Sequence, residues 1–316
     1  MQTKVDQTYI DDPLRILRCI RMSCKFGFTI SDETYKAMKR NVQRLKIITK
    51  ERIQAEFNKI LMSENAVMGI NMLHDIGAMT FIVPEFEKCY SLTQNRFHFG
   101  DVAEHTLAVL DYHCKHFDAD LTERLACFLH DIGKIMTRSV KDGKVHFYNH
   151  EYVGAELTGD ILRELKYDTD TIKKVQFLIR NHMRTKQAGD GARYMKDKSL
   201  HKLLYECKTF EMFKSLMRII ECDNEAHAKD CCIHNQYSEL VAKVELEGSH
   251  SKMFGYKLPV TGEDIMCVLG LEPGPIIAEI NKRLLNQAFM DPEISKERCI
   301  KLLPGIRKQA EQVLKK

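Results

Sequence analysis

The stretch Leu125–Lys134, which reads LACFLHDIGK, decides how the rest of this 316-residue chain is interpreted. It places His130 next to Asp131 at the end of an apolar run that predicts a helix over residues 121–136. Adjacent imidazole and carboxylate side chains can both reach a single metal ion. A divalent ion held in this way produces hydroxide from water at neutral pH, which suits phosphoester hydrolysis.

Four further side chains of ligand type lie on other predicted helices. On three of these helices the ligand-type residue continues the apolar stripe that faces the core, and on the fourth it stands at the helix start. A carboxylate on an apolar face is costly unless a cation or several donors lie beside it. The four residues, each with its predicted helix, are His105 (101–116), His150 (150–165), His182 (170–183) and Asp223 (209–228).

These residue types predict a divalent metal site. Imidazole and carboxylate ligands suit Mg, Mn, Fe, Co, Ni or Zn. The His-Asp doublet with His105 and Asp223 predicts one ion, whereas His150 and His182 are ligands only if a second ion binds. The alternative for any single histidine is a hydrogen-bonded core residue, but the conjunction favours metal binding.

The other patterns predict an all-α protein. Apolar residues recur every three or four positions, and no segment shows sustained strand alternation. Asp142-Gly143 predicts a short hairpin or loop over 139–148, and the weakly periodic segment Gly77–Gln94 predicts a linker. The expected parts are a neck and body over 1–85, a helical bundle over 86–235 and a helical tail over 236–316.

Composition restricts the surroundings and the partners of the chain. Residues 1–62 carry 13 Lys/Arg and 7 Asp/Glu, a charge of +6 in a chain of net charge +4, which favours a polyanionic partner. The 11 cysteines form no CxxC pair, which is typical of free thiols in a reducing cytoplasm. No apolar run reaches the roughly 20 residues that span a bilayer, so we expect no membrane association.

The ligand spacing resembles the HD superfamily of metal-dependent phosphohydrolases. In that family the first His, the doublet and the last Asp bind one metal, and intervening histidines hold a second in some branches. Lys134 matches the basic residue of the HDxGK form and would hold a substrate phosphate, the alternative being a solvated lysine at a helix end. The resemblance implies that His130, Asp131 and Lys134 are catalytic and that the metal ligands are His105, His130, Asp131, His150, His182 and Asp223.

The flanking segments resemble class II tRNA nucleotidyltransferases, the CCA-adding enzymes and bacterial poly(A) polymerases. The motifs are DDPLRILR at 11–18 with Phe26-Gly27-Phe28, Glu51-Arg52-Ile53, TGEDIM at 261–266 and LGLEPGPIIAEINKR at 269–283. The resemblance implies that Asp12 and Arg15 read the edge of a nucleotide base. Arg15, Arg18 and Arg21 form a basic stripe that either contacts RNA phosphates or is a solvated, salt-bridged helix face.

The family's catalytic head, with its Gly-Ser turn and D-x-D strand pair, has no counterpart before Asp11. Asp168-Thr169-Asp170 is a D-x-D elsewhere, but it predicts a helix cap. We therefore expect no nucleotide addition by this chain alone, which would be a fragment, half of a split enzyme or a headless homologue. A separately encoded head is the partner that the second case requires.

Two functions remain open. The first is metal-dependent hydrolysis of a nucleotide or RNA-end phosphoester, of the 2′,3′-cyclic phosphodiesterase, nucleotidase or phosphatase type. The alternative is a tRNA- and nucleotide-binding part of a CCA-adding enzyme, in which the HD site is structural or vestigial.

Three further patterns in the sequence are weaker signals of function. His74-Asp75 also precedes Ile-Gly but lacks the downstream lysine, and we expect it to end a body helix. The histidines and cysteines of 227–234 fit no common zinc spacing. Phe97, Phe99 and Tyr148 could frame a base near the metal site, although packing in the core is the favoured alternative.

Overall fold

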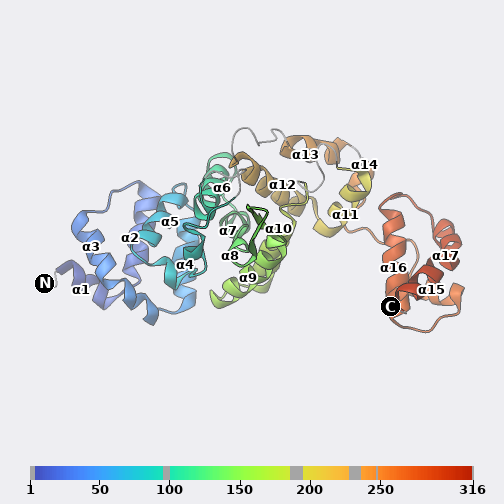
Figure 1. The fold of residues 1–316 in the computed structure, drawn as a ribbon, viewed down its shortest axis with the longest axis horizontal. Coiled ribbons are helices and arrows are strands. Elements are labelled where there is room, and N and C mark those ends of the chain that lie inside the picture. The colour runs from blue at the N-terminus through green and yellow to red at the C-terminus, as the bar shows by residue number, and fades with distance from the viewer. Residues whose placement is uncertain (1–3, 95–99, 186–194, 228–235, 247, 315–316) are drawn as a thin grey trace. The chain divides into compact units, whose positions relative to one another are not determined.

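The computed structural model describes residues 4–94, 100–185, 195–227, 236–246 and 248–314 (Figure 1). The chain divides into two compact units, the first Met1–Gln187 with Ser215–Tyr237 and the second Ala188–Lys214 with Ser238–Lys316. The predicted all-α class is confirmed, and the described residues contain one two-stranded sheet besides the helices. Among these residues, no helix has the length and apolar character needed to cross a bilayer.

The first unit contains the expected neck and body, and the expected bundle over 86–235 without residues 188–214, which belong to the second unit. It holds α12 from Ser215 onward. Its 3-10 helices are Val42–Ile47, Met79–Phe81 and Phe86–Cys89, and its strands are β1 (Arg138–Lys141) and β2 (Lys144–Phe147). Its α-helices are α1 (Lys4–Asp11), α2 (Arg15–Phe26), α3 (Asp32–Asn41), α4 (Lys50–Leu61), α5 (Ala66–Asp75), α6 (Val102–His116), α7 (Leu121–Leu129), α8 (Lys134–Thr137), α9 (His150–Glu164), α10 (Thr169–Asn181) and α12 (Phe210–Glu225).

The second unit has its own core. Ile265, Ile280, Leu284 and Leu303 are fully buried where its last three helices pack together. Pro275 occupies the first turn of α16, where its missing N–H would have had no partner in the helix. The helices of this unit are α11 (Asp197–Cys207), α13 (Gln236–Leu246, which begins in the first unit), α14 (Gly248–Ser251), α15 (Gly262–Leu269), α16 (Pro275–Ala288) and α17 (Lys296–Leu314).

Local signals set the helix ends near the doublet. A capping box starts α6: Asp101 Oδ1 accepts from Glu104 N at 2.9 Å, and Glu104 Oε2 accepts from Asp101 N at 2.9 Å. The predicted continuous helix over 121–136 is wrong, because α7 ends at Leu129 and α8 starts only at Lys134. This break places the His-Asp doublet at a helix end rather than within a helix.

The predicted linker over Gly77–Gln94 is also wrong. Met79, Ile82, Val83 and Phe86 are at most 2% exposed, so the segment belongs to the core of the first unit. Its short 3-10 turns bury apolar side chains without the 3.6-residue period that marks an α-helix. Weak periodicity therefore reflected turn geometry rather than exposure.

An aromatic cluster joins the body to the bundle directly behind the doublet. Phe128 lies two residues before His130, and its ring centroid is 4.4 Å from that of Phe86 and 5.8 Å from that of Phe57. All three rings are at most 1% exposed. Burying each such side chain contributes about 2–3 kcal/mol to stability. This packing holds the end of α7, and with it the doublet, against the body.

Arg124 provides a second tie between body and bundle. It is 2% exposed, and its guanidinium donates to Leu61 O at 2.5 Å and to Ser63 O at 2.6 Å. These carbonyls lie at and beyond the carboxyl end of α4, where carbonyls lack helical partners and a cation is favoured.

We expect Arg124→Met to lower the free energy of unfolding by about 3 kcal/mol, because hydrogen bonds to a charged donor are lost and two buried carbonyls are left without it. Urea unfolding followed by circular dichroism measures this change. Arg163→Met is the matched control, since Arg163 pairs with Asp160 on the surface, where both side chains are more than half exposed. An equal loss of unfolding free energy in the two variants would contradict the role of Arg124 as a buried tie between body and bundle.

Candidate metal centre

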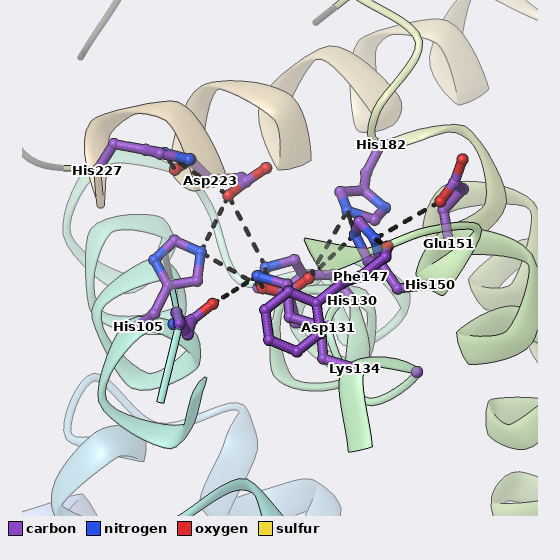
Figure 2. Close-up of polar contacts among 12 residues, drawn as sticks. His105, His130, Asp131, Lys134, Phe147, His150, Glu151, His182, Asp223 and His227 are labelled. Carbon is purple, nitrogen blue, oxygen red and sulfur yellow. Dashed lines mark hydrogen bonds and ion pairs between the residues drawn. The ribbon is translucent and has the colours of Figure 1, made fainter. Parts of the chain in front are cut away.

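The first unit brings all six predicted ligand residues into one buried place (Figure 2). Five helices supply them, and three of the histidines lie at helix ends. The six residues, with their positions, are His105 within α6, His130 and Asp131 after α7, His150 at the start of α9, His182 after α10, and Asp223 within α12.

The helix-end histidines share one hydrogen bond that fixes their protonation. In each, Nδ1 meets the carbonyl three residues earlier, and because a carbonyl only accepts, Nδ1 must carry the proton. In the neutral ring, Nε2 then carries a lone pair that can bind a cation. The distances are 2.9 Å from His130 to Cys127 O, 2.8 Å from His150 to Phe147 O and 2.6 Å from His182 to Ile179 O.

The ligand atoms form two groups. His105, His130 and Asp223 make one, Asp131, His150 and His182 make the other, and within each group the atoms lie within 4.8 Å of one another. From the sequence, Asp131 was predicted to bind the same ion as His105, His130 and Asp223. The distances group it with His150 and His182 instead.

Asp131 lies between the two groups, and its two oxygens face different ways (Figure 2). Oδ2 is 3.1 Å from His130 Nε2 and 3.6 Å from His105 Nε2. Oδ1 is 3.3 Å from His150 Nε2 and 4.0 Å from His182 Nε2. A single carboxylate thus faces both groups, which is the placement that a ligand shared by two ions requires.

The chemistry of the donors fits cations. His150 Nε2 lies 3.4 Å from His182 Nε2, although in their neutral forms neither atom has a hydrogen to donate. His130 Nε2 is buried and makes no hydrogen bond among the described residues. Buried lone pairs that converge without a proton donor are costly unless a cation lies among them.

The pKa values favour the metal-binding forms of His182 and Asp131, but not that of His130. Burial, helped by the neighbouring His130 and His150, lowers the pKa of His182 to about 3, so this ring stays neutral. Burial would raise the pKa of the Asp131 carboxyl, but His130 and Lys134 outweigh it and hold that pKa well below its usual range. Burial would lower the pKa of His130, but the Asp131 charge raises it. Cation binding at His130 therefore competes with a proton.

Lys134 is part of this buried cluster. It is 3% exposed, so the alternative of a solvated lysine is wrong. Its Nζ lies 2.7 Å from Asp131 Oδ2 and 2.6 Å from Gln94 Oε1, and 5.4 Å from the centre of the Phe147 ring. The ammonium therefore holds the shared carboxylate in place.

Four residues near the ligands were missed or assigned elsewhere in the sequence. Gln94 holds Lys134, and Phe147 supplies both a ring for Lys134 and a carbonyl for His150. Glu151 Oε2 is 3.6 Å from His150 Nδ1. His227, predicted within a separate cluster, donates from Nδ1 to Asp223 O at 2.5 Å, while residues 228–234 of that cluster lie outside the described residues.

The predicted nucleotide-binding residues lie on the neck. Arg18 pairs with Asp12 at 3.2 Å and approaches Glu56 at 3.7 Å, and Arg21 pairs with Glu56 at 2.8 Å. Arg15 is exposed, and its guanidinium is 3.4 Å from Thr8 O. Part of the basic stripe is thus salt-bridged, whereas base reading by Asp12 and Arg15 and RNA contact by Arg18 stay predictions.

The weaker patterns resolve in different ways. His74-Asp75 ends α5, as predicted, and His74 Nδ1 contacts Glu87 at 2.8 Å. Asp168 caps α10, as predicted, by accepting from Thr171 N. Tyr148 is 61% exposed, so its predicted packing in the core is wrong, and Phe97 and Phe99 lie outside the described residues.

Two protein families match this chain. Residues 27–90 match the family described as "Probable RNA and SrmB- binding site of polymerase A". Residues 102–211 match the HD domain family, and this range includes the doublet and five of the six predicted ligands, with Asp223 beyond its end.

The same resemblance extends over most of the chain. The A-adding tRNA nucleotidyltransferase of Deinococcus radiodurans is 30% identical over 283 residues, which are 86% of this chain and 63% of the relative. The CC-adding tRNA nucleotidyltransferase of Thermus thermophilus is 26% identical over 293 residues, 89% of this chain and 63% of the relative. The chain therefore spans less than two thirds of the length of these relatives.

A solved structure shares the fold. The CCA-adding enzyme of Bacillus stearothermophilus in complex with CTP aligns with a TM-score of 0.64 at 16% identity, over 98% of this chain and 65% of that one. The likeness supports the helical neck, body and tail expected from the flanking motifs. Motifs, domain matches and relatives agree: over most of its length the chain is similar to CCA-adding tRNA nucleotidyltransferases, and residues 102–211 match the HD domain family.

Proposed function

We propose that this chain is a metal-dependent phosphohydrolase that acts on a nucleotide or RNA-end phosphoester. The observation that carries this proposal is the buried pair of ligand groups on either side of Asp131. Hydrolysis of a phosphoester adds water across a P–O bond, and the released oxygen takes a proton.

The residues around Asp131 would divide the work between holding ions and holding each other. His105, His130 and Asp223 would hold one divalent ion, His150 and His182 a second, with Asp131 facing both. When bound, such ions supply hydroxide at neutral pH and polarise a phosphoryl oxygen. Lys134 acts as a positioning residue, because its ammonium is already engaged by the shared carboxylate.

The relatives support RNA-end phosphoesters as the substrate class. They are named for adding A or CC to tRNA, and residues 27–90 match a region described as RNA-binding. A hydrolase beside such a region would meet terminal phosphates and 2′,3′-cyclic phosphates of RNA.

We expect turnover of p-nitrophenyl phosphate or 2′,3′-cyclic AMP with at least one of Ni²⁺, Mn²⁺, Co²⁺ and Mg²⁺. His130→Ala should lose this turnover because a ligand is removed. His74→Ala is the matched control, since it changes the other His-Asp doublet, which contacts Glu87 instead of the two ligand groups. No turnover with any metal, or full activity in His130→Ala, would sink the proposal.

A second candidate is a tRNA- and nucleotide-binding role beside a nucleotidyltransferase head encoded elsewhere. It is favoured by the two relatives described above, which are named for adding A or CC to tRNA and of each of which this chain spans 63%. It predicts tRNA binding that weakens steeply with salt, and incorporation of ATP or CTP only when a separate head is added. Phosphohydrolysis and this role can coexist, so the two tests are independent.

A further inference from the structure

The β1–β2 hairpin presents two chemically different faces. Its register pairs Ser139 with His146 and Lys141 with Lys144, and side chains alternate between faces along each strand. Arg138, Val140, Val145 and Phe147 therefore share one face, on which the Phe147 ring lies under Lys134. The other face, called the basic face below, carries Ser139, Lys141, Lys144 and His146.

Tyr148 extends the basic face with an aromatic platform. Its ring stacks on that of His146, with centroids 5.1 Å apart and planes 7° from parallel. Tyr148 is 61% exposed, so the platform is open to solvent on its far side. Parallel, exposed rings of this kind stack nucleic-acid bases with little regard for sequence.

The charge of the hairpin complements a polyanion. Residues 138–148 contain three basic side chains and one acidic side chain, Asp142, for a net charge of +2. Neither Lys141 nor Lys144 forms an ion pair with any described residue, and β1 is exposed along its whole length. Two unpaired lysines beside an aromatic platform are the combination that binds a single-stranded backbone.

The platform lies next to the metal centre along the chain. Tyr148 precedes the ligand His150 by two residues, so their Cα atoms are at most about 7 Å apart. His150 is also anchored on the hairpin itself, because its Nδ1 donates to Phe147 O. A base on the platform and a phosphate near His150 can therefore belong to one nucleotide or to two adjacent ones.

We propose that the basic face and its platform bind the last nucleotides of a single-stranded RNA whose terminal phosphoester lies at the Asp131 centre. This proposal rests on the phosphohydrolase function and narrows its substrate from free nucleotides to RNA ends. Tyr148 holds a base, and Lys141 with Lys144 holds the phosphates upstream of it.

The test compares two substrates in one protein. One is a hexanucleotide RNA that ends in a 2′,3′-cyclic phosphate, and the other is p-nitrophenyl phosphate, which has neither a base nor upstream phosphates. We expect Tyr148→Ala to lower the ratio of their kcat/KM values roughly tenfold, the effect of losing one stacked base. Tyr148→Phe, which keeps the ring, should restore the ratio.

The lysines have a control on the opposite face. The double variant Lys141→Gln, Lys144→Gln should bind the hexanucleotide with a weaker salt dependence. The negative slope of log affinity against log salt concentration should become shallower by about 1.4, or about 0.7 per phosphate contact. Arg138→Gln removes one charge from the same hairpin but from the other face, and it should leave slope and ratio unchanged. An equal effect of Arg138→Gln per charge removed would overturn the assignment to the basic face.

The outcomes separate the two proposals. If the wild type hydrolyses p-nitrophenyl phosphate but Tyr148→Ala leaves the ratio unchanged, the hairpin proposal fails while the phosphohydrolase stands. If no substrate is hydrolysed, the phosphohydrolase proposal fails. The affinity of the protein for a fluorescently labelled hexanucleotide, measured by fluorescence anisotropy, then tests the hairpin proposal. Equal affinity of wild type and Tyr148→Ala would then overturn the hairpin proposal, and a roughly tenfold loss would support it.

Discussion

Substituting Asp131 by Asn is expected to lower kcat/KM for phosphoester hydrolysis by more than a hundredfold and to remove metal from both ligand groups. The size follows from a comparison: outer-shell partners of metal ligands already cost about 10- to 100-fold when mutated. Asp131 is a stronger case, since one oxygen faces His130 at 3.1 Å and the other faces His150 at 3.3 Å. Kinetics and metal analysis of the purified variant measure the two effects.

The same substitution should also destabilise the fold. Lys134 is buried 2.7 Å from the carboxylate, and breaking a buried pair by removing one charge costs about 3–5 kcal/mol. Adding Lys134→Met to Asp131→Asn should recover part of this stability but none of the metal. Asp160→Asn is the control, because Asp160 is an exposed carboxylate. Retention of metal in Asp131→Asn would show that this carboxylate is no ligand.

Substituting Gly133 by Ala is expected to destabilise the protein by about 3 kcal/mol, at the upper end of overpacking effects. A Cβ at this position would lie 2.5 Å from Gly154 N and 2.8 Å from Gly154 Cα, and closer still to His150 O. These are backbone atoms, so α9 would have to move. Because α9 begins at His150, the metal affinity of the second group should fall as well.

The sign of the Gly133 effect makes the test decisive. Its φ of −65° suits any residue, and Gly→Ala at an unobstructed helical position stabilises by about 0.5–1 kcal/mol. Gly305→Ala within α17 is the control, because no atom lies within 4 Å of its added Cβ. Denaturant unfolding of both variants should give opposite signs, and a stable Gly133→Ala protein would refute the close approach of the two backbones.

Helical phase was enough to find the distant members of the site. His105 and Asp223 lie 118 residues apart in the sequence, yet both continue apolar stripes, and Nε2 of one lies 3.1 Å from Oδ1 of the other. Each stripe has to face the core, so polar residues within stripes converge there. The all-α class followed from the same periodicity. The HD family was implied by the resemblance of the ligand spacing, and the nucleotidyltransferase relatives by the flanking motifs.

Prediction from the sequence was wrong or incomplete where the structure does not follow the 3.6-residue period of an α-helix. The break after Leu129 carries no proline, and the close approach of Gly133 to Gly154 beside it joins residues far apart in the sequence. The contact between Gln94 and Lys134 joins residues 40 positions apart, and no local pattern reports it. The 3-10 turns of the supposed linker were missed for the same reason, since they bury Phe86 without repeating.

The most direct test of the central claim is the metal content of the purified chain, measured by mass spectrometry after loading with Mn²⁺ or Co²⁺ and gel filtration. Two ligand groups that share Asp131 predict two ions per chain in the wild type. They also predict about one ion in His182→Ala and none in Asp131→Asn. A wild type that retains no ion, or an Asp131→Asn protein that retains as much metal as the wild type, would contradict the account.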